Sequence, residues 1–312
     1  MLTREECCDF LRQHDDYLIL THIRPDGDTL GGAAALCHGL RRLGKRAWLF
    51  PNREITRTYE AMITPYYAPG DYVGQTVVAV DVAAAHMLCR GFEGTVHLSL
   101  DHHPHGGAFS EQCLVDPSKA AGGELILEIL DELLGGIDRE EADLLYVAVS
   151  TDSGCFRFAN TTADTFRAAA RLTDAGARIA ELNKLLFRSK SRARMLLEGA
   201  ICSSLLSYRN AEINIAVVTL EMMAHAGAEE DDCQDMADLA GMVIGNKVAV
   251  TVRELRPGHC KISLRTDGSV DAIAVCRRFG GGGHRMAAGC EIDLPPFEAA
   301  EAVRQVVEEY WP

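Results

Sequence analysis

The first third of the chain contains three apolar, strand-like runs, and each of them leads into acidic residues or histidines. Residues 17–21 precede a polar segment that starts at His22. The runs at residues 76–80 and 95–100 are each followed by an aspartate. Stretches with helical periodicity separate these runs, which predicts a mostly parallel α/β sheet flanked by helices. Because ligands bind such sheets at the carboxyl ends of the strands, we expect the polar residues there to lie close together.

The rest of the chain completes a two-domain pattern. A capping box of Thr3 and Glu6 starts the first helix, and further helical patterns follow the strand-like runs. After about residue 207 the pattern indicates a smaller α+β domain. We expect an N-terminal α/β domain over residues 1–185, a connecting helix over 186–207 and a C-terminal α+β domain over 208–312. The other predicted helices are 31–43, 120–134, 139–149, 162–175, about 178–206, 270–279 and 296–310, and the other predicted strands are 46–50, 213–220, 248–255 and 260–265.

The charge balance excludes one class of ligand. The chain has 31 Lys plus Arg against 45 Asp plus Glu, a formal net charge of −14. A protein that binds long duplex nucleic acid gains affinity by releasing counterions from the phosphates, which requires a basic face. We therefore expect no long duplex partner, whereas a short phosphorylated ligand can be held by a few cations or by bound metal ions.

Two further features indicate the compartment. No run of about 18 apolar residues is present to span a bilayer, and the charged N-terminus lacks the apolar stretch of a signal peptide. The eleven cysteines are odd in number and form no CxxC pair, which is typical of free thiols in a reducing compartment. We expect a cytoplasmic protein that does not contact membranes.

The first group of candidate metal ligands lies in the turn after residues 17–21. His22, Asp26 and Asp28 are close in sequence there, and Pro25 and Gly27 favour a turn. Three metal ligands can thus converge at one point of the sheet edge. Alternatively, the aspartates form an Asx turn that caps the next helix, and these residues alone leave both interpretations open.

Further candidates follow the other strands and one apolar helix. Asp81 ends its strand, Asp101 is followed by His102 and His103, and Asp152 follows the helix. Neighbouring residues on extended backbone point to opposite sides, so we expect one histidine to bind metal and the other to act differently. Asp101 is then placed to orient an imidazole. Taken singly, such aspartates also suit helix caps, and the histidines suit a solvated surface pair.

The donor set indicates the metal. Carboxylates mixed with imidazoles suit Mn²⁺ or a similar divalent ion, and no thiolate lies among the candidates to favour zinc. So many carboxylates repel one another unless cations lie between them. Two divalent ions about 3.5–4 Å apart would neutralise them, generate a hydroxide at neutral pH and hold a phosphoryl group for in-line attack.

Taken together, these residues resemble the four motifs of the DHH phosphoesterase superfamily, in the same order and on the same elements. A glycine-rich segment near the C-terminus is similar to the signature of the DHHA1 substrate-binding domain. The resemblance covers nearly the whole chain and implies a DHH catalytic domain followed by a DHHA1 domain. The matching motifs are His22-x3-Asp26-x-Asp28, Asp81, Asp101-His102-His103, Asp152, and Phe279-Gly280-Gly281-Gly282-Gly283-His284-x2-Ala287-Ala288-Gly289.

The resemblance also assigns roles to the motif residues. It implies two Mn²⁺ ions that share one carboxylate. His103 would contact the scissile phosphate, either stabilising charge or assisting the leaving oxygen, with Asp101 as the second catalytic residue. The implied metal ligands are His22, Asp26 and Asp81 for one ion and Asp28, Asp81, His102 and Asp152 for the other.

The glycine run at residues 280–283 also has a physical interpretation of its own. Consecutive glycines can form a nest of backbone amides that binds an anion, and His284 can add a donor to a phosphate. Alternatively, the run is a flexible C-cap of the preceding helix. Arg265 resembles a basic residue that precedes this loop in the family. The candidate substrate-binding residues are Arg265, Gly282, Gly283 and His284, and weaker candidates are Arg157, Arg277, Arg278 and Arg285.

Two such domains without further modules look most like the stand-alone NrnA type of the superfamily. The resemblance implies a manganese-dependent phosphoesterase that hydrolyses short oligoribonucleotides (nanoRNA) and 3′-phosphoadenosine 5′-phosphate (pAp) through a metal-activated hydroxide. One alternative is a phosphodiesterase for cyclic di-AMP or linear pApA, and another is a non-catalytic nucleotide sensor. The expected partners are short oligonucleotides or small nucleotides, and a homodimer stays open.

Overall fold

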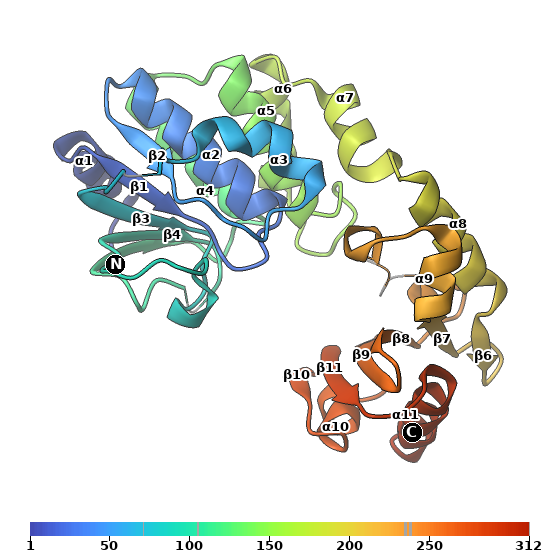
Figure 1. The fold of residues 1–312 in the computed structure, drawn as a ribbon. Coiled ribbons are helices and arrows are strands. Elements are labelled where there is room, and N and C mark those ends of the chain that lie inside the picture. Colours follow the sequence, from blue (N-terminus) through green and yellow to red (C-terminus); the bar gives the residue numbers. More distant parts are fainter. Residues whose placement is uncertain (71, 105, 234–235, 237–238, 312) are drawn as a thin grey trace. The chain divides into compact units, whose positions relative to one another are not determined.

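The computed structural model describes the chain except for residues 71, 105, 234–235, 237–238 and 312 (Figure 1). The chain divides into two units, Met1–Ser189 and Lys190–Pro312. Each unit has its own sheet and its own apolar core. The predicted fold class, a parallel α/β domain followed by a smaller domain with a second sheet, is therefore confirmed.

The sheet of unit 1 consists of five parallel strands in the order β2-β1-β3-β4-β5. Four of them coincide with the predicted strands to within a few residues. The fifth strand, β5, is absent from the prediction, because this edge strand is only partly buried and has no continuous apolar run. The bounds are β1 Tyr17–Leu20, β2 Ala47–Leu49, β3 Thr76–Val80, β4 Leu98–Asp101 and β5 Gln112–Val115.

The helices of unit 1 begin at residues that suit helix starts. Thr3 and Glu6 form the predicted capping box of α1. Helix α2 starts at Gly27 rather than at residue 31, because the Asp26 side chain caps it there. The bounds are α1 Arg4–Gln13, α2 Gly27–Arg42, α3 Arg57–Ile63, α4 Gly122–Leu134, α5 Arg139–Asp152, α6 Ala163–Asp174 and α7 Ile179–Asn183, with 3₁₀ turns at Thr64–Tyr66 and Ala85–Met87.

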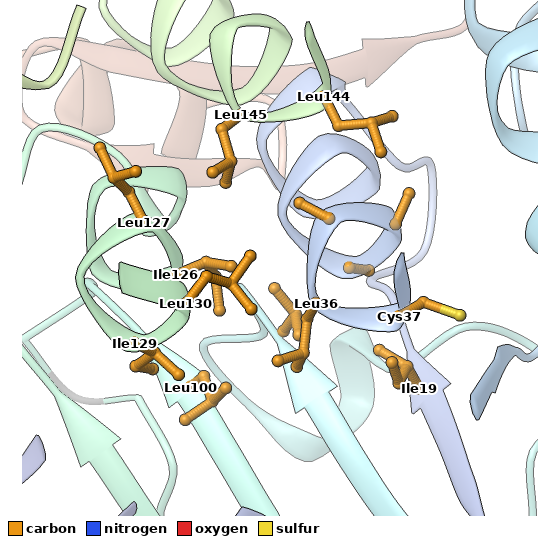
Figure 2. Packing of buried hydrophobic residues seen from close by; sticks show 14 of the residues in the cluster. Ile19, Leu36, Cys37, Leu100, Ile126, Leu127, Ile129, Leu130, Leu144 and Leu145 are labelled. Carbon is orange, nitrogen blue, oxygen red and sulfur yellow. The ribbon is translucent and has the colours of Figure 1, made fainter. Parts of the chain in front are cut away.

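Alternate residues of the central strands enter two different cores. In β1, Tyr17 and Ile19 belong to the cluster that contains the buried residues of α2, α4 and α5, whereas Leu18 and Leu20 belong to a second cluster. Figure 2 shows part of the first cluster between these helices and the strands. The second cluster is completed by residues from loops. Burial of both faces explains why these strands read as continuous apolar runs.

Helices α2 and α5 approach each other closely through glycines. A Cβ atom on Gly31 would lie 2.3 Å from the carbonyl oxygen of Leu144, and one on Gly27 would lie 2.4 Å from Oγ1 of Thr151. Only residues without a side chain allow this approach. The start of α2 and the end of α5 therefore reach the same edge of the sheet.

The segment that follows α6 is helical but not continuous. After α7 comes one π-helical turn at Lys184–Arg188, and the helix is interrupted before α8, Arg192–Ser203, begins. The prediction of one helix over about 178–206 is therefore wrong in its continuity. Ser191 caps α8 by accepting a hydrogen bond from the Arg194 amide, which explains the new start.

Unit 2 contains a six-stranded sheet in the order β10-β11-β9-β8-β7-β6, in which β7 and β8 are parallel and the other neighbours antiparallel. In β8, Val248, Val250 and Val252 pack with α10 and α11, while Ala249 packs with α8 on the opposite face. The bounds are β6 Leu206–Tyr208, β7 Ile213–Val218, α9 Leu220–Ala226, β8 Val248–Arg256, β9 His259–Thr266, α10 Ala272–Arg277, β10 Gly282–His284, β11 Ala287–Ile292 and α11 Pro296–Glu309, with 3₁₀ turns at Glu230–Cys233 and Ala240–Met242.

Several of the unit 2 elements differ from the prediction. The predicted strand 213–220 ends at Val218, because Thr219 caps the unpredicted helix α9 by accepting a hydrogen bond from the Met222 amide. The strands β6, β10 and β11 are also absent from the prediction. The sequences of β10 and β11 are rich in glycine and alanine, so they lack a β-branched or aromatic signal.

The structure also describes the thiols and the apolar character of the helices. All eleven cysteines are free, and all except Cys113, Cys155 and Cys202 are buried. Within the part of the chain that the structure describes, no helix combines the length and the apolar character needed to span a membrane.

Candidate metal centre

Motif residues from five elements meet at the carboxyl ends of β1, β3 and β4. Helices α2 and α5 contribute aspartates to the same place. The structure brings together every residue that the sequence analysis named as a metal ligand. Together with His103, which was not predicted to bind metal, they form three overlapping groups with ligand atoms within 4.8 Å of one another: His22, Asp26 and Asp81; Asp28, His102 and Asp152; and Asp81, His102 and His103.

Asp81 lies between the first two groups. Its Oδ2 is 3.8 Å from Nε2 of His22, and its Oδ1 is 3.5 Å from Nε2 of His102. The side chain is 4% exposed, and Oδ1 has no hydrogen-bond partner among the described residues. A buried carboxylate oxygen without a donor is costly unless a cation compensates it. The residues present therefore fit a bound cation.

The backbone conformation at Asp81 places its side chain between the two groups of ligand atoms. Its φ is 55°, so the chain leaves the extended conformation at the residue that follows β3. The left-handed region is uncommon for a residue with a side chain. The Asp81 amide donates to the carbonyl oxygen of Leu100, at 2.8 Å, which holds the turn against β4.

Two histidines present bare nitrogens to the carboxylates. Nδ1–H of His22 donates to the carbonyl oxygen of Ile23 at 2.8 Å, and Nδ1–H of His102 donates to that of Lys119 at 3.1 Å. In the neutral form of each ring Nε2 is then an acceptor, and it faces carboxylate oxygens at 3.5 Å, those of Asp26 and Asp152 respectively. Two acceptors at such separations cannot hydrogen bond, whereas a shared metal ion satisfies both.

The carboxylates of Asp26 and Asp28 also accept hydrogen bonds from backbone amides at the starts of helices. Asp26 Oδ1 accepts hydrogen bonds from the amides of Asp28 and Thr29, so the helix-cap interpretation holds for this residue. Asp28 accepts the amides of Gly122 and Gly123 at 2.7 and 2.8 Å, at the start of α4. The two interpretations of this turn are therefore compatible, because each carboxylate can cap a helix and still face the cluster.

The crowding of carboxylates disturbs their protonation. Burial, followed by the negative charges of Asp81 and Asp152, raises the pKa of Asp28 well above its usual range. Burial also raises the pKa of Asp152 to about 6, although the nearby His102 opposes the shift. Burial alone would lower the pKa of His22, but contact with Asp26 leaves it raised. A divalent cation would relieve this repulsion.

Asp101 and His103 form a second, linked arrangement. Oδ1 of Asp101 lies 2.9 Å from Nδ1 of His103 and also accepts the backbone amides of His102 and His103. The hydrogen bond to Asp101, together with the negative charge of Asp81, whose Oδ1 lies 3.4 Å from Nδ1 of His103, raises the pKa of His103 to about 10. Gly106 leaves room for this carboxylate, because a Cβ atom there would lie 1.8 Å from Oδ2 of Asp101. The two adjacent histidines thus differ in their other partners, although a ring nitrogen of each lies within 3.5 Å of Oδ1 of Asp81. The prediction that only one of them binds metal stays a prediction.

Arg265 and His284 lie on one exposed face of the unit 2 sheet. Arg265 of β9 pairs with Ala287 of β11, and Ala287 pairs with His284 of β10. Directly paired residues share a face of a sheet. Arg265 and His284 are both exposed, so two basic side chains flank a small one on this face.

The glycine run does not form the expected nest at its start. The amide of Gly280 donates to the carbonyl oxygen of Arg277 at 3.1 Å, and that of Gly281 donates to the carbonyl oxygen of Cys276 at 2.9 Å. These bonds close the C-terminus of α10, as in the alternative C-cap interpretation. Gly282 and Gly283 instead belong to β10 and are exposed.

The sequence analysis missed Asn52, which supports the turn that carries His22. Its side chain is 4% exposed, and Nδ2 donates to Oγ1 of Thr21 and to the carbonyl oxygen of His22, at 3.0 and 2.9 Å. The sequence could have indicated this residue, because Asn52 lies just after the predicted strand at residues 46–50. Polar residues that follow strands of such a sheet belong to the site region.

The architecture defines a class of protein. Unit 1 has a parallel α/β sheet whose carboxyl edge carries clustered carboxylates and imidazole nitrogens, and a unit with a separate sheet follows it. This is the architecture of a two-domain α/β phosphoesterase. The chain belongs to the DHH family of phosphoesterases, which are hydrolases. It matches the family model "DHH family, N-terminal domain" over residues 16–149 and the model "DHHA1 domain" over residues 212–311.

Individual relatives agree with this assignment. The bifunctional oligoribonuclease and PAP phosphatase NrnA of Thermus thermophilus is 34% identical over 296 residues, which cover 93% of this chain and 89% of the relative. The cyclic-di-AMP phosphodiesterase GdpP of Geobacillus thermodenitrificans is 25% identical, and the match covers 97% of this chain but 49% of that protein. The crystal structure of an exopolyphosphatase-related protein from Bacteroides fragilis has the same fold, with a TM-score of 0.87 at 20% identity, covering 98% of this chain and 96% of that one.

Proposed function

We propose that this protein hydrolyses short oligoribonucleotides and removes the 3′-phosphate of pAp, using two divalent cations, with Mn²⁺ as the first candidate. The similarity to NrnA over nearly the full length of both chains supports the substrates. The position of Asp81 between two ligand groups, with a buried and unpartnered Oδ1, is the observation that carries the two-cation arrangement. Mixed oxygen and imidazole donors suit Mn²⁺.

The proposal divides the ligands between two positions. When bound, the cations would neutralise the carboxylates and supply a nucleophilic water at neutral pH. His22, Asp26 and Asp81 would hold one of them, and the other would take Asp28, Asp81, His102 and Asp152. The first set is one group of ligand atoms that lie within 4.8 Å of one another, and the second set without Asp81 is another. Asp81 is in a position to join them, because its Oδ1 lies 3.5 Å from Nε2 of His102.

His103 is the proposed group that acts on the leaving oxygen. Asp101 holds its Nδ1–H, so Nε2 carries the proton that can be transferred when the ring is charged. The hydrogen bond to Asp101 raises the pKa of His103 and so favours the charged ring, which suits stabilisation of charge on the phosphate. Asp101 is the residue that orients this acid.

Unit 2 supplies the proposed second contact with the nucleotide. Arg265 and His284 are exposed on one face of its sheet, and both are donors that can bind a terminal phosphate. Gly282 and Gly283 lie beside them without side chains, which allows a ligand to approach the backbone closely. We further propose that the protein acts in the reducing cytoplasm, where its thiols stay free.

A substrate panel with metal add-back tests this function. Metal-stripped protein would be given Mn²⁺ and then a labelled pentaribonucleotide, pAp or cyclic di-AMP. We expect turnover of the pentaribonucleotide and pAp only after Mn²⁺ is added. Turnover of cyclic di-AMP alone would instead identify a cyclic-dinucleotide phosphodiesterase. No turnover of any substrate would favour a nucleotide sensor.

A matched pair of variants shows whether the metal centre is responsible. Asp152→Asn removes a proposed ligand at the last residue of α5, and Asp174→Asn changes an exposed aspartate at the last residue of α6. We expect the first variant to lose Mn²⁺-dependent turnover and the second to keep it. Equal activities in both variants would contradict the proposed centre.

A further inference from the structure

The loop that follows Asp152 has an uncommon backbone. Gly154, Cys155 and Phe156 have φ angles of 57°, 57° and 63°, so three successive residues are left-handed. For residues with side chains this conformation is costly and persists only where the surroundings impose it. Here the Cys155 amide donates to the carbonyl oxygen of Ser150 at 2.6 Å, which folds the loop back onto the end of α5.

Two further residues anchor this loop. The ring of Phe156 lies between those of Tyr146 and Phe166, with centroid distances of 6.2 and 5.5 Å. Asn160 donates from Nδ2 to the carbonyl oxygen of Asp152 at 3.1 Å. The residues between these anchors are therefore held in one position beside a proposed metal ligand.

Arg157 and Phe158 are the two large side chains in the exposed part of this loop, residues 157–160. The ring of Phe158 is 54% exposed and lies against Gly154, where a Cβ atom would be 2.5 Å from it. Nε of Arg157 donates to the carbonyl oxygen of Gly154 at 2.6 Å, which fixes the guanidinium near the same residue. Among the described carboxylates none forms an ion pair with Arg157, so its terminal nitrogens are available to a ligand.

We propose that Arg157 and Phe158 form a nucleotide subsite on unit 1, in which the guanidinium binds the phosphate next to the scissile one and the ring stacks on a base. The inference rests on the proposed function and deepens it. A fixed guanidinium loses little freedom when it binds a phosphate, and stacking on an aromatic ring is how proteins hold single-stranded bases. The subsite also explains why a large apolar ring is exposed on the loop that follows Asp152.

Kinetics with matched substrates test this subsite. Arg157→Ala, Phe158→Ala and Phe158→Trp would be compared with the unaltered protein on a 5′-phosphorylated diribonucleotide, on the same molecule lacking its second base, and on bis-p-nitrophenyl phosphate. We expect each alanine variant to raise KM for the diribonucleotide about 10-fold, since stacking and charged hydrogen bonds are of that size. Phe158→Trp should keep KM near the original value, and Phe158→Ala should have no effect on the substrate that lacks the base.

Controls separate a binding role from a structural one. Arg167→Ala and Phe297→Ala remove exposed side chains of the same kinds elsewhere on the chain and should not change KM. Mn²⁺ affinity should stay unchanged in the Arg157 and Phe158 variants. A loss of Mn²⁺ affinity would indicate that the loop only supports the metal centre, and would overturn the inference.

The two proposals fail in different ways. If the unaltered protein hydrolyses the diribonucleotide and both alanine variants have the same KM as it does, the subsite is wrong and the proposed function stands. If the unaltered protein cleaves bis-p-nitrophenyl phosphate but no nucleotide, the proposed function is wrong and the subsite falls with it.

Discussion

Asp101 and His103 are joined by a hydrogen bond of 2.9 Å between Oδ1 and Nδ1, and the same oxygen accepts both backbone amides that follow Asp101. One fully buried carboxylate therefore sets the turn after β4 and the orientation of the second imidazole. Both imidazoles lie near Asp81, but Nε2 of His102 also faces Asp28 and Asp152. The hydrogen bond between Asp101 and His103 therefore gives the second imidazole a partner that the imidazole of His102, its neighbour in the sequence, does not share.

Replacing Asp101 by asparagine should impair turnover more than metal binding. The amide oxygen can still accept the two backbone amides, but the charge that keeps His103 protonated and oriented is lost. We expect kcat to fall about 100-fold, the lower end of what a positioned acid contributes, while the Kd for Mn²⁺ changes little. Steady-state kinetics and calorimetric titration with Mn²⁺ measure the two effects. A variant that lost Mn²⁺ binding and kept kcat at saturating metal would contradict this role.

Asn52→Ala should weaken the binding of Mn²⁺ at the candidate metal centre. The change removes donors to Thr21 and to the His22 carbonyl, so the turn that carries His22 loses its support. We expect Mn²⁺ affinity to fall about 10-fold, as for other residues that orient metal ligands, and the free energy of unfolding to fall by about 1–3 kcal/mol.

The buried Asn214 of unit 2 provides the control for this variant. It is fully buried and donates to the carbonyl oxygen of Ala211 and to Oδ1 of Asn246. Asn214→Ala should lower stability by a similar amount and leave Mn²⁺ affinity unchanged. Equal loss of Mn²⁺ affinity in both variants would show that Asn52 acts through general stability alone.

Gly31→Ala tests the close contact between α2 and α5. A Cβ atom would lie 2.3 Å from the backbone oxygen of Leu144, so the helices must move apart. We expect a loss of about 1–3 kcal/mol in the free energy of unfolding, measured by urea denaturation. Gly199→Ala in α8 is the matched control, since its Cβ would meet nothing within 4 Å. That change should raise helix stability by about 0.5–1 kcal/mol, and an equal loss in both variants would contradict the packing argument.

Glu124→Gln should change how stability depends on pH. Glu124 is 3% exposed, and burial raises its pKa above 4.5. The folded state therefore binds this proton more tightly than the unfolded state, and the stability this provides is lost as pH rises from 4.5 through the raised pKa. Glutamine does not titrate, so the Tm difference, variant minus original, should become more positive as pH rises.

Thermal unfolding over a pH series measures this difference. Glu298→Gln changes an exposed glutamate that also lies in the first turn of a helix, so it serves as the control. Its Tm difference should vary less with pH than that of Glu124→Gln. The same pH trend in both variants would show that the trend does not come from burial of Glu124.

Sequence patterns predicted most of the elements that carry the metal centre. The strands before His22, Asp81 and Asp101 are buried on both faces, and this burial produces the long apolar runs that identify them. Strands without such a run were not predictable. β10 and β11 consist largely of glycine and alanine and form through pairing with β9, which local preference does not reveal.

The order of acidic residues and histidines along the chain by itself determined which side chains lie at one sheet edge, because parallel strands of an α/β sheet all end there. Only the tertiary structure decided what each of them contacts. Asp26 both caps a helix and faces His22, Gly280 and Gly281 bond to the helix before them, and Asn52 reaches behind His22. These outcomes depend on distances between elements far apart in sequence, which local residue preferences do not encode.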